Sequence, residues 1–129
     1  MTIQFNHTIV DAVDREEEAA FFTQVMGLAA ARPFGPFLVA DLAHDASLDF
    51  VQGGSEVLER HYAFLVSDDE FTDIYARIVE RDIDHWADPQ GRRAGEINRH
   101  DGGRGVYFRG PSGHLYEIIT RPYGSGATT

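Results

Sequence analysis

The chain has 129 residues, of which 43% are hydrophobic and 25% are charged, values that are typical of one globular domain with its own core. It contains no cysteine, and its 11 basic residues are all arginine, which excludes disulfides, thiolate metal sites, a cysteine nucleophile and a lysine Schiff base. A net charge of −10 disfavours nucleic-acid and membrane partners, and no apolar run or leader pattern predicts a membrane segment, so we expect a soluble, cytoplasmic protein.

The first half of the chain predicts one helix followed by strands. Asp14 and Glu17 have the spacing of a helix capping box, and Gly27 stands where a left-handed residue ends a helix. Between them, apolar residues recur at helical spacing and predict one buried face. The other elements predicted in this half are strands at 3–10, 37–42 and 47–51, a turn at His44-Asp45 and a linker-like stretch at 52–55.

The second half predicts the same kind of unit. Ser67 or Asp68 caps a helix whose apolar residues recur at helical spacing from Phe71 to Val79. A polar, glycine-rich loop at 88–105 separates the short strands, and the tail at 124–129 is expected to be flexible. The strands predicted here lie at 60–66, 85–86, 106–109 and 114–120, with a tight turn at 110–113.

The two halves repeat at an offset of 54 residues. His7 corresponds to His61, and the acidic cap residue Asp14 corresponds to Asp68. A repeat of this length predicts two copies of one supersecondary unit, neither of which can bury its own sheet face. We therefore expect a single α+β domain over 1–129, in which βαβββ repeats at 1–54 and 55–123 form a curved mixed sheet with helices on its outer face.

Three side chains suggest metal chemistry. His7 and His61 hold the same position in the two repeats, and pseudo-twofold packing would bring them together. Glu117 lies among aliphatic residues of the last strand, where a buried carboxylate needs a partner or a metal. Two imidazoles and one carboxylate suit Fe(II), Mn(II), Ni(II) or Zn(II) with coordination positions left open. The alternatives are hydrogen-bonded structural histidines and a Glu117 that pairs with an arginine.

Charge is distributed unevenly along the chain. Residues 1–90 contain 5 Arg and 18 acidic residues, whereas residues 91–129 contain 6 Arg and 3 acidic residues. The arginines of the second segment could form an anion-attracting rim, and the alternative is an ordinary solvated loop surface. The arginines considered for this rim are Arg92, Arg93, Arg99, Arg104 and Arg109.

Three sequence motifs resemble those of the vicinal-oxygen-chelate superfamily, which includes glyoxalase I, extradiol dioxygenases, fosfomycin-resistance transferases and bleomycin-resistance proteins. The motifs are F-N-H-T-I-V, H-Y-A-F-L-V and Y-F-R-G-P-S-G-H-L-Y-E, and the resemblance extends over nearly all of residues 3–122. The closing motif usually reads D-P-D-G-H-x-x-E. Here Gly110 and Ser112 replace its two aspartates, whereas the proline, the glycine and Glu117 remain.

The resemblance implies roles for particular residues. His7, His61 and Glu117 match the metal ligands of the superfamily, and Asp49 occupies the place of a fourth carboxylate, although it is one methylene shorter than the usual Glu. Tyr107 matches a tyrosine that contacts substrate. His100 lies near the place of a catalytic histidine of extradiol enzymes, with different spacing, so an exposed loop histidine is the alternative. The resemblance therefore implies Glu117, Tyr107 and His100 as catalytic residues.

The resemblance also implies a divalent-metal enzyme that binds two adjacent oxygens of a small molecule, with dioxygenase-like or lyase/isomerase-like chemistry. Glyoxalase I itself is less favoured because of Asp49, and fosfomycin transfer because the chain has no lysine. The alternative is a metal-free protein that sequesters an aromatic or cationic compound, as bleomycin-resistance proteins do. Small members resemble one another in forming homodimers with shared active sites, which would combine His7 and Asp49 of one subunit with His61 and Glu117 of the other.

Overall fold

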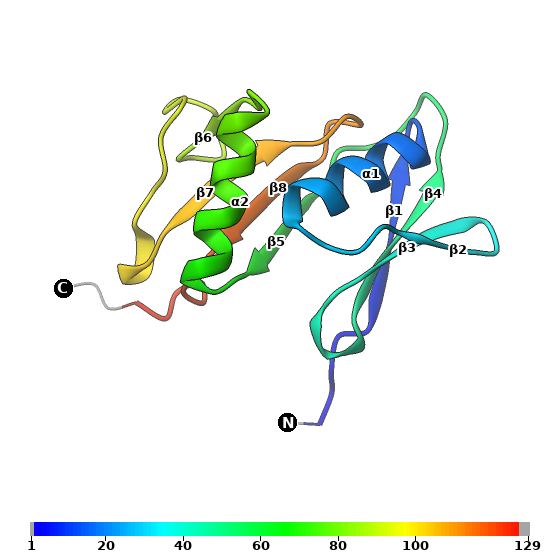
Figure 1. Ribbon diagram of the computed structural model, residues 1–129, viewed down its shortest axis with the longest axis horizontal. Helices are drawn as coiled ribbons and strands as arrows, with labels where there is room; N and C mark the ends of the chain where they lie inside the picture. Colours follow the sequence, from blue (N-terminus) through cyan, green and yellow to red (C-terminus); the bar gives the residue numbers. More distant parts are fainter. Residues whose placement is uncertain (1, 127–129) are drawn as a thin grey trace. The chain divides into compact units, whose positions relative to one another are not determined.

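The computed structural model describes residues 2–126, which divide into two compact units between Leu58 and Glu59. Each unit contains one helix and four strands (Figure 1). The elements of unit 1 are β1 (His7–Ala12), α1 (Arg15–Met26), β2 (Arg32–Phe34), β3 (Phe37–Asp41), the short 3-10 helix η1 (Ala43–Asp45) and β4 (Ser47–Gln52). The elements of unit 2 are β5 (His61–Leu65), α2 (Asp68–Glu80), β6 (His85–Trp86), η2 (His100–Gly102), β7 (Gly105–Arg109) and β8 (Leu115–Ile119).

The two units have the same strand order. Sheet 1 runs β1-β4-β3-β2 and sheet 2 runs β5-β8-β7-β6. In each sheet the first strand of the unit lies at one edge and pairs in parallel with the last strand, and the remaining pairs are antiparallel. The predicted α+β fold with two βαβββ repeats is therefore confirmed, and the repeats form one four-stranded mixed sheet each.

Both helices begin as the sequence predicts. The Asp14 carboxylate accepts a hydrogen bond from the Glu17 backbone N–H, and α1 ends at Gly27, whose φ of 73° is in the left-handed region. Ser67 caps α2 in a complete capping box with Glu70. These caps satisfy backbone groups that a helix end leaves without partners, and so they set the point at which each helix starts.

Each sheet has one face turned to its helix and one open face. In β1 and β4 the buried residues alternate with exposed or half-buried ones, and Val10 and Phe50 are fully buried. In β8 the same alternation buries Tyr116 and Ile118. Because neighbouring residues of a strand point to opposite faces, the polar residues between these positions lie on the open faces.

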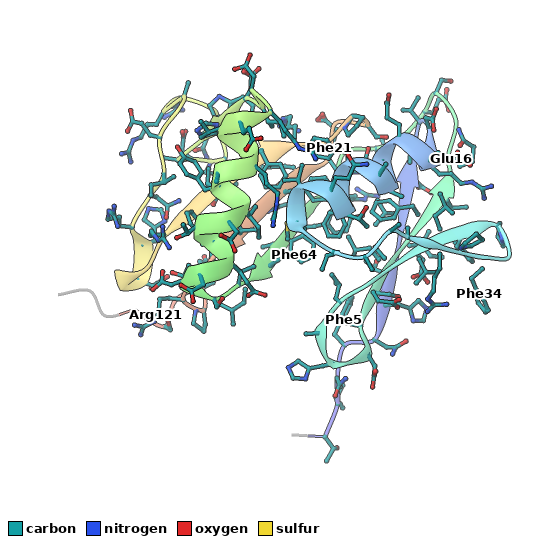
Figure 2. All side chains as sticks on the ribbon, in the orientation of Figure 1. Phe5, Glu16, Phe21, Phe34, Phe64 and Arg121 are labelled. Carbon is teal, nitrogen blue, oxygen red and sulfur yellow. The ribbon has the colours of Figure 1, made fainter. Side chains whose placement is uncertain are left out.

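Two features of unit 1 differ from expectation. Residues 32–34 form the fourth strand of unit 1, β2. The sequence did not locate this strand because its three residues are all exposed and include a proline, as edge strands allow. Its Phe34 is 66% exposed at the β2–β3 hairpin (Figure 2). The acidic run Glu16-Glu17-Glu18 is typical of the solvated N-terminal face of a helix, but Glu18 is fully buried.

Two further predictions concern the environment and the end of the chain. No helix among residues 2–126 is long and apolar enough to cross a membrane. The tail was expected to be flexible over 124–129, but the Gly124 and Gly126 backbone N–H groups both donate to the Asp101 carboxylate, at 3.1 and 2.8 Å. Residues 127–129 of the predicted tail lie outside the described part of the chain.

Candidate functional site

The parallel strand pair of unit 2, β5 and β8, brings a histidine and a carboxylate together. In the parallel register of β5 and β8, His61 lies opposite Leu115 and Ala63 lies opposite Glu117. His61 and Glu117 are therefore two positions apart on the same open face. Their side chains meet, with His61 Nε2 2.9 Å from Glu117 Oε1. The Glu117 side chain is 13% exposed, so this carboxylate depends on partners within the fold.

Tyr107 completes a cluster on the same face. It lies on β7 directly opposite Glu117 in the antiparallel register and is only 8% exposed. Burial raises the pKa of the Tyr107 phenol well above its ordinary value, and the charge of Glu117 and a hydrogen bond to it raise this pKa further. The phenol therefore keeps its proton throughout the neutral range and acts as a hydrogen-bond donor.

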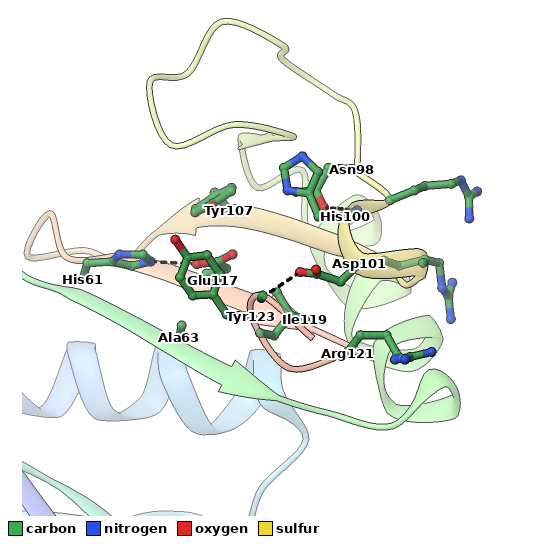
Figure 3. A pocket seen from close by; sticks show the side chains of 14 residues that line it. His61, Ala63, Asn98, His100, Asp101, Tyr107, Glu117, Ile119, Arg121 and Tyr123 are labelled. Atoms are coloured by element: carbon green, nitrogen blue, oxygen red, sulfur yellow. Dashed lines mark hydrogen bonds and ion pairs between the residues drawn. The ribbon is translucent and has the colours of Figure 1, made fainter. Parts of the chain in front are cut away.

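These three side chains line a cavity of about 1110 Å³ (Figure 3). That volume slightly exceeds the usual range for small-molecule sites, roughly 300–1,000 Å³. The remaining lining comes from β5, β8, the segment after β8 and the loop before β7. These lining residues are Ala63, Asn98, Arg99, His100, Asp101, Gly102, Arg104, Ile119, Arg121, Tyr123 and Gly124.

The loop wall of the cavity is held in place by Asn98. This residue is 4% exposed, and its side-chain amide donates to the Ala87 carbonyl at 2.8 Å while its Oδ1 accepts from the His100 backbone N–H at 3.2 Å. The backbones of Asn98 and Gly105 also exchange two hydrogen bonds. A Cβ at Gly105 would lie 2.8 Å from Asn98 Oδ1, so this approach requires glycine. His100 is thereby placed at the cavity, on the loop side (Figure 3).

The other two predicted ligands, His7 and Asp49, lie in unit 1. Both are on the open face of sheet 1, where Ile9 pairs in register with Asp49. His7 Nδ1 is 2.7 Å from Asn6 Oδ1, and the Asp49 carboxylate accepts a hydrogen bond of 2.7 Å from the Ser47 hydroxyl. The structure thus brings His61, Glu117, Tyr107 and His100 to one cavity, and it places His7 and Asp49 on the other unit.

The geometry of the His61–Glu117 pair fits a metal in part. Two ligand atoms that bind one ion at right angles, each at about 2.1 Å, are about 3 Å apart. The His61 Nε2 to Glu117 Oε1 distance of 2.9 Å meets this requirement. Within residues 2–126, however, no group of three or more His, Asp or Glu side chains is close enough to hold an ion. Unit 2 therefore supplies two donors and needs at least one more.

Several cavity residues were not predicted as site residues. Asn98, Asp101, Arg121 and Tyr123 carry no motif that separates them from other polar loop or tail residues. Conversely, His44, His85 and His114 had no motif reason to be catalytic, and none of them lines the cavity. His114 is fully buried, and its Nδ1 accepts a hydrogen bond from the Arg60 backbone N–H.

Together, duplicated βαβββ units and a histidine–carboxylate pair on an open sheet face beside a cavity define a class of small-molecule-binding α+β proteins. No protein-family model matches the chain. The solved structure of the oxidase ChaP-H1 is 57% identical in sequence and superposes with a TM-score of 0.92. The alignment covers 95% of this chain and 99% of ChaP-H1. The chain belongs to the vicinal-oxygen-chelate superfamily, as the sequence motifs predicted.

More distant relatives agree with this assignment. The metallothiol transferase FosB of Lysinibacillus sphaericus (strain C3-41) is 29% identical over 126 residues, which cover 93% of this chain and 84% of the relative. A lactoylglutathione lyase from Agrobacterium tumefaciens shares the fold, with a TM-score of 0.69 and 18% identity over 94% of this chain and 96% of the other.

Proposed function

We propose that this protein is a divalent-metal-dependent oxidase or dioxygenase that binds two adjacent oxygens of a small, planar substrate. The observation that carries the proposal is the His61–Glu117 pair, whose donor atoms are 2.9 Å apart at the end of a cavity large enough for a polycyclic molecule. His7, from the other repeat or from a second copy of the chain, supplies the third donor. Asp49 is a candidate fourth ligand.

The choice among the chemistries of the superfamily rests on the relatives. The 57% identical solved structure is described as an oxidase, which favours oxidation over lyase or isomerase chemistry. The 29% identical relative is described as a metallothiol transferase, which supports metal dependence. When bound, the divalent ion supplies Lewis acidity and open positions for two substrate oxygens.

The chain's own residues have separate tasks in this proposal. His61 and Glu117 would hold the ion at one end of the cavity. Tyr107 remains protonated because burial and Glu117 raise its pKa, so its hydroxyl donates a hydrogen bond to a substrate oxygen as negative charge develops there. His100 lies on the opposite, loop side of the cavity, where its imidazole takes up or returns a proton. Ala63 and Ile119 provide the apolar floor against which a planar ring packs.

The assembly is part of the same proposal. In a homodimer, His7 and Asp49 of each subunit would complete the His61–Glu117 pair of the other. A cytoplasmic location is consistent with a chain that has no cysteine.

The test is elemental analysis of untagged protein purified without chelators. We expect about one equivalent of Fe, Mn, Ni or Zn per chain in the wild type, and its loss in His61→Ala. His44→Asn is the matched control, because it removes a histidine outside the cavity and asparagine tolerates the positive φ of 58° at that turn. Metal retained by His61→Ala would contradict the assigned ligand.

The second candidate function is a metal-free binding protein, which the large cavity volume favours. It predicts no stoichiometric metal in either protein and unchanged binding of aromatic compounds in His61→Ala. A catechol panel, loaded anaerobically with Fe(II) and then exposed to oxygen, separates the two functions further. A ring-cleavage chromophore supports the dioxygenase, and its absence with every member excludes ring cleavage of these catechols.

A further inference from the structure

The end of the cavity away from His61 contains two arginines, Arg99 and Arg121. Figure 3 shows His61 and Arg121 at opposite ends of the cavity. Arg99 and Arg121 line both this cavity and an adjoining polar recess of about 530 Å³. Among residues 2–126, neither guanidinium forms an ion pair with a carboxylate.

Three other arginines of this part of the chain differ from these two. Arg93 pairs with Glu96, Arg104 pairs with Asp68 and packs over the Phe71 ring, and Arg109 pairs with Glu59. These three side chains are held by partners within the fold. Of the two remaining arginines of the predicted rim, Arg92 lines neither cavity and Arg99 lines both. Arg121, which lines the same recess as Arg99, was not among the predicted arginines.

The acidic side chains near the recess form contacts within the fold. Both carboxylate oxygens of Asp101 accept backbone N–H groups, from Gly124 and Gly126, and Asp68 pairs with Arg104. Asp101 keeps its negative charge but does not line the recess, whose lining contains three arginines and one carboxylate, Asp68. The recess therefore has an excess of two positive charges in a chain whose net charge is −10. An arginine guanidinium is planar and presents parallel N–H donors, which match the geometry of carboxylates and phosphates.

We propose that Arg99 and Arg121 form an oxyanion subsite, which binds an anionic group on the substrate at the end opposite its chelating oxygens. The substrate class is then a planar aromatic molecule with adjacent oxygens at one end and a carboxylate or phosphate at the other. This inference rests on the proposed function for its catalytic meaning, but the anion binding itself needs no metal.

The test uses fluorescence titration of protein that has been freed of metal on a chelating resin. The probes are pyrene-1-carboxylate and the neutral pyrene-1-carboxamide, which have the same ring system. We expect the wild type to bind the carboxylate about tenfold more tightly, and the Arg99→Gln/Arg121→Gln double variant to bind both equally. Raising the NaCl concentration should reduce the wild-type preference, because both guanidiniums are solvent-exposed.

Arg92→Gln is the matched control, because Arg92 lies in the same loop and lines neither cavity. It should keep the wild-type preference. Glutamine at 121 retains the methylenes that lie against Gly103, and circular dichroism checks that the double variant is folded. A wild type without preference, or a double variant that keeps it, would overturn the subsite.

Competition distinguishes the two oxyanions. Stronger displacement of pyrene-1-carboxylate by benzoate assigns the subsite to carboxylates, stronger displacement by inorganic phosphate assigns it to phosphate esters, and displacement by neither overturns it. Because the titration is done without metal, a protein that fails the metal analysis can still pass this test, and the reverse also holds.

Discussion

The two units share a strand order but differ in one connection and one acid. In unit 1, two residues, 35 and 36, connect β2 to β3, whereas in unit 2 residues 87–104 connect β6 to β7. This longer connection supplies six of the residues that line the cavity, from Asn98 to Arg104. The comparison teaches that the repeat provides the scaffold and that one loop in one copy creates the cavity.

The acids of the two units occupy the same register position. Asp49 lies opposite the residue two after His7, as Glu117 lies opposite the residue two after His61. Glu117 reaches its histidine at 2.9 Å, whereas Asp49, one methylene shorter, accepts a hydrogen bond from Ser47. The residue across from the acid also differs, since Val39 stands where unit 2 has Tyr107.

The largest expected effect tests the two acids against each other. Glu117→Gln should weaken metal binding at least about 100-fold, because it removes the charge of the proposed ligand itself. Mutating residues that only hydrogen-bond to a metal ligand already lowers metal affinity or activity about 10–100-fold. Asp49→Asn makes the same chemical change at the equivalent position and should have a smaller effect. Isothermal titration with the metal found in the wild type measures both. Equal losses would show that the two acids have equal roles.

The next effect concerns Tyr107, which unit 1 replaces with Val39. Tyr107→Phe removes the hydroxyl donor and should lower kcat by about 100-fold for any substrate turned over in the catechol panel, while the metal content stays the same. Tyr123→Phe is the control, since Tyr123 also lines the cavity but is 92% exposed. A Tyr107→Phe enzyme with full kcat would remove Tyr107 from the proposed mechanism.

Helix capping should affect both units to a similar, smaller extent. Asp14→Ala and Ser67→Ala each remove a side chain that accepts from a first-turn N–H and should lower the free energy of unfolding by about 1 kcal/mol. Ser67 should show the larger loss, because it belongs to a complete capping box. Urea denaturation measures both, with Ser55→Ala outside any helix as the control. A loss in the control as large as those in the cap variants would contradict this assignment.

The smallest effect appears only at alkaline pH. The fold raises the pKa of Tyr107, so the protonated phenol contributes stability that is present below about pH 10, the ordinary tyrosine pKa, and is lost as pH rises toward the folded-state value. Between pH 9 and 11, the free energy of unfolding should therefore fall more steeply in the wild type than in Tyr107→Phe. Tyr123→Phe should follow the wild type. Parallel curves for all three proteins would mean that the fold does not perturb Tyr107.

Much of the fold could be predicted because its signals are local. The caps at Asp14 and Ser67, the glycine after the first helix and the alternation around Glu117 each depend on a few neighbouring residues. The strand β2 was missed because its three exposed residues carry no alternating pattern. The burial of Glu18 was missed because a helix position shows its environment only after the helix has packed.

The candidate site was predictable only where a repeat or a motif identified it. His61, Glu117 and Tyr107 follow from the 54-residue offset and the closing motif, and the structure places them beside one cavity. Asn98, Arg99 and Arg121 have no such signal. Their positions depend on the path of a long loop and on the segment after β8.

The sequence by itself determined the superfamily and the two βαβββ repeats and supplied the candidate site residues, because periodicity, caps and motifs can be recognised from the order of neighbouring residues. The tertiary structure decided which of those side chains meet and which arginines remain without a partner. Strand register, burial and ion pairing join residues far apart in the chain. Arg104 and Asp68, 36 residues apart, are one such pair, and their pairing leaves the charge of the recess to Arg99 and Arg121.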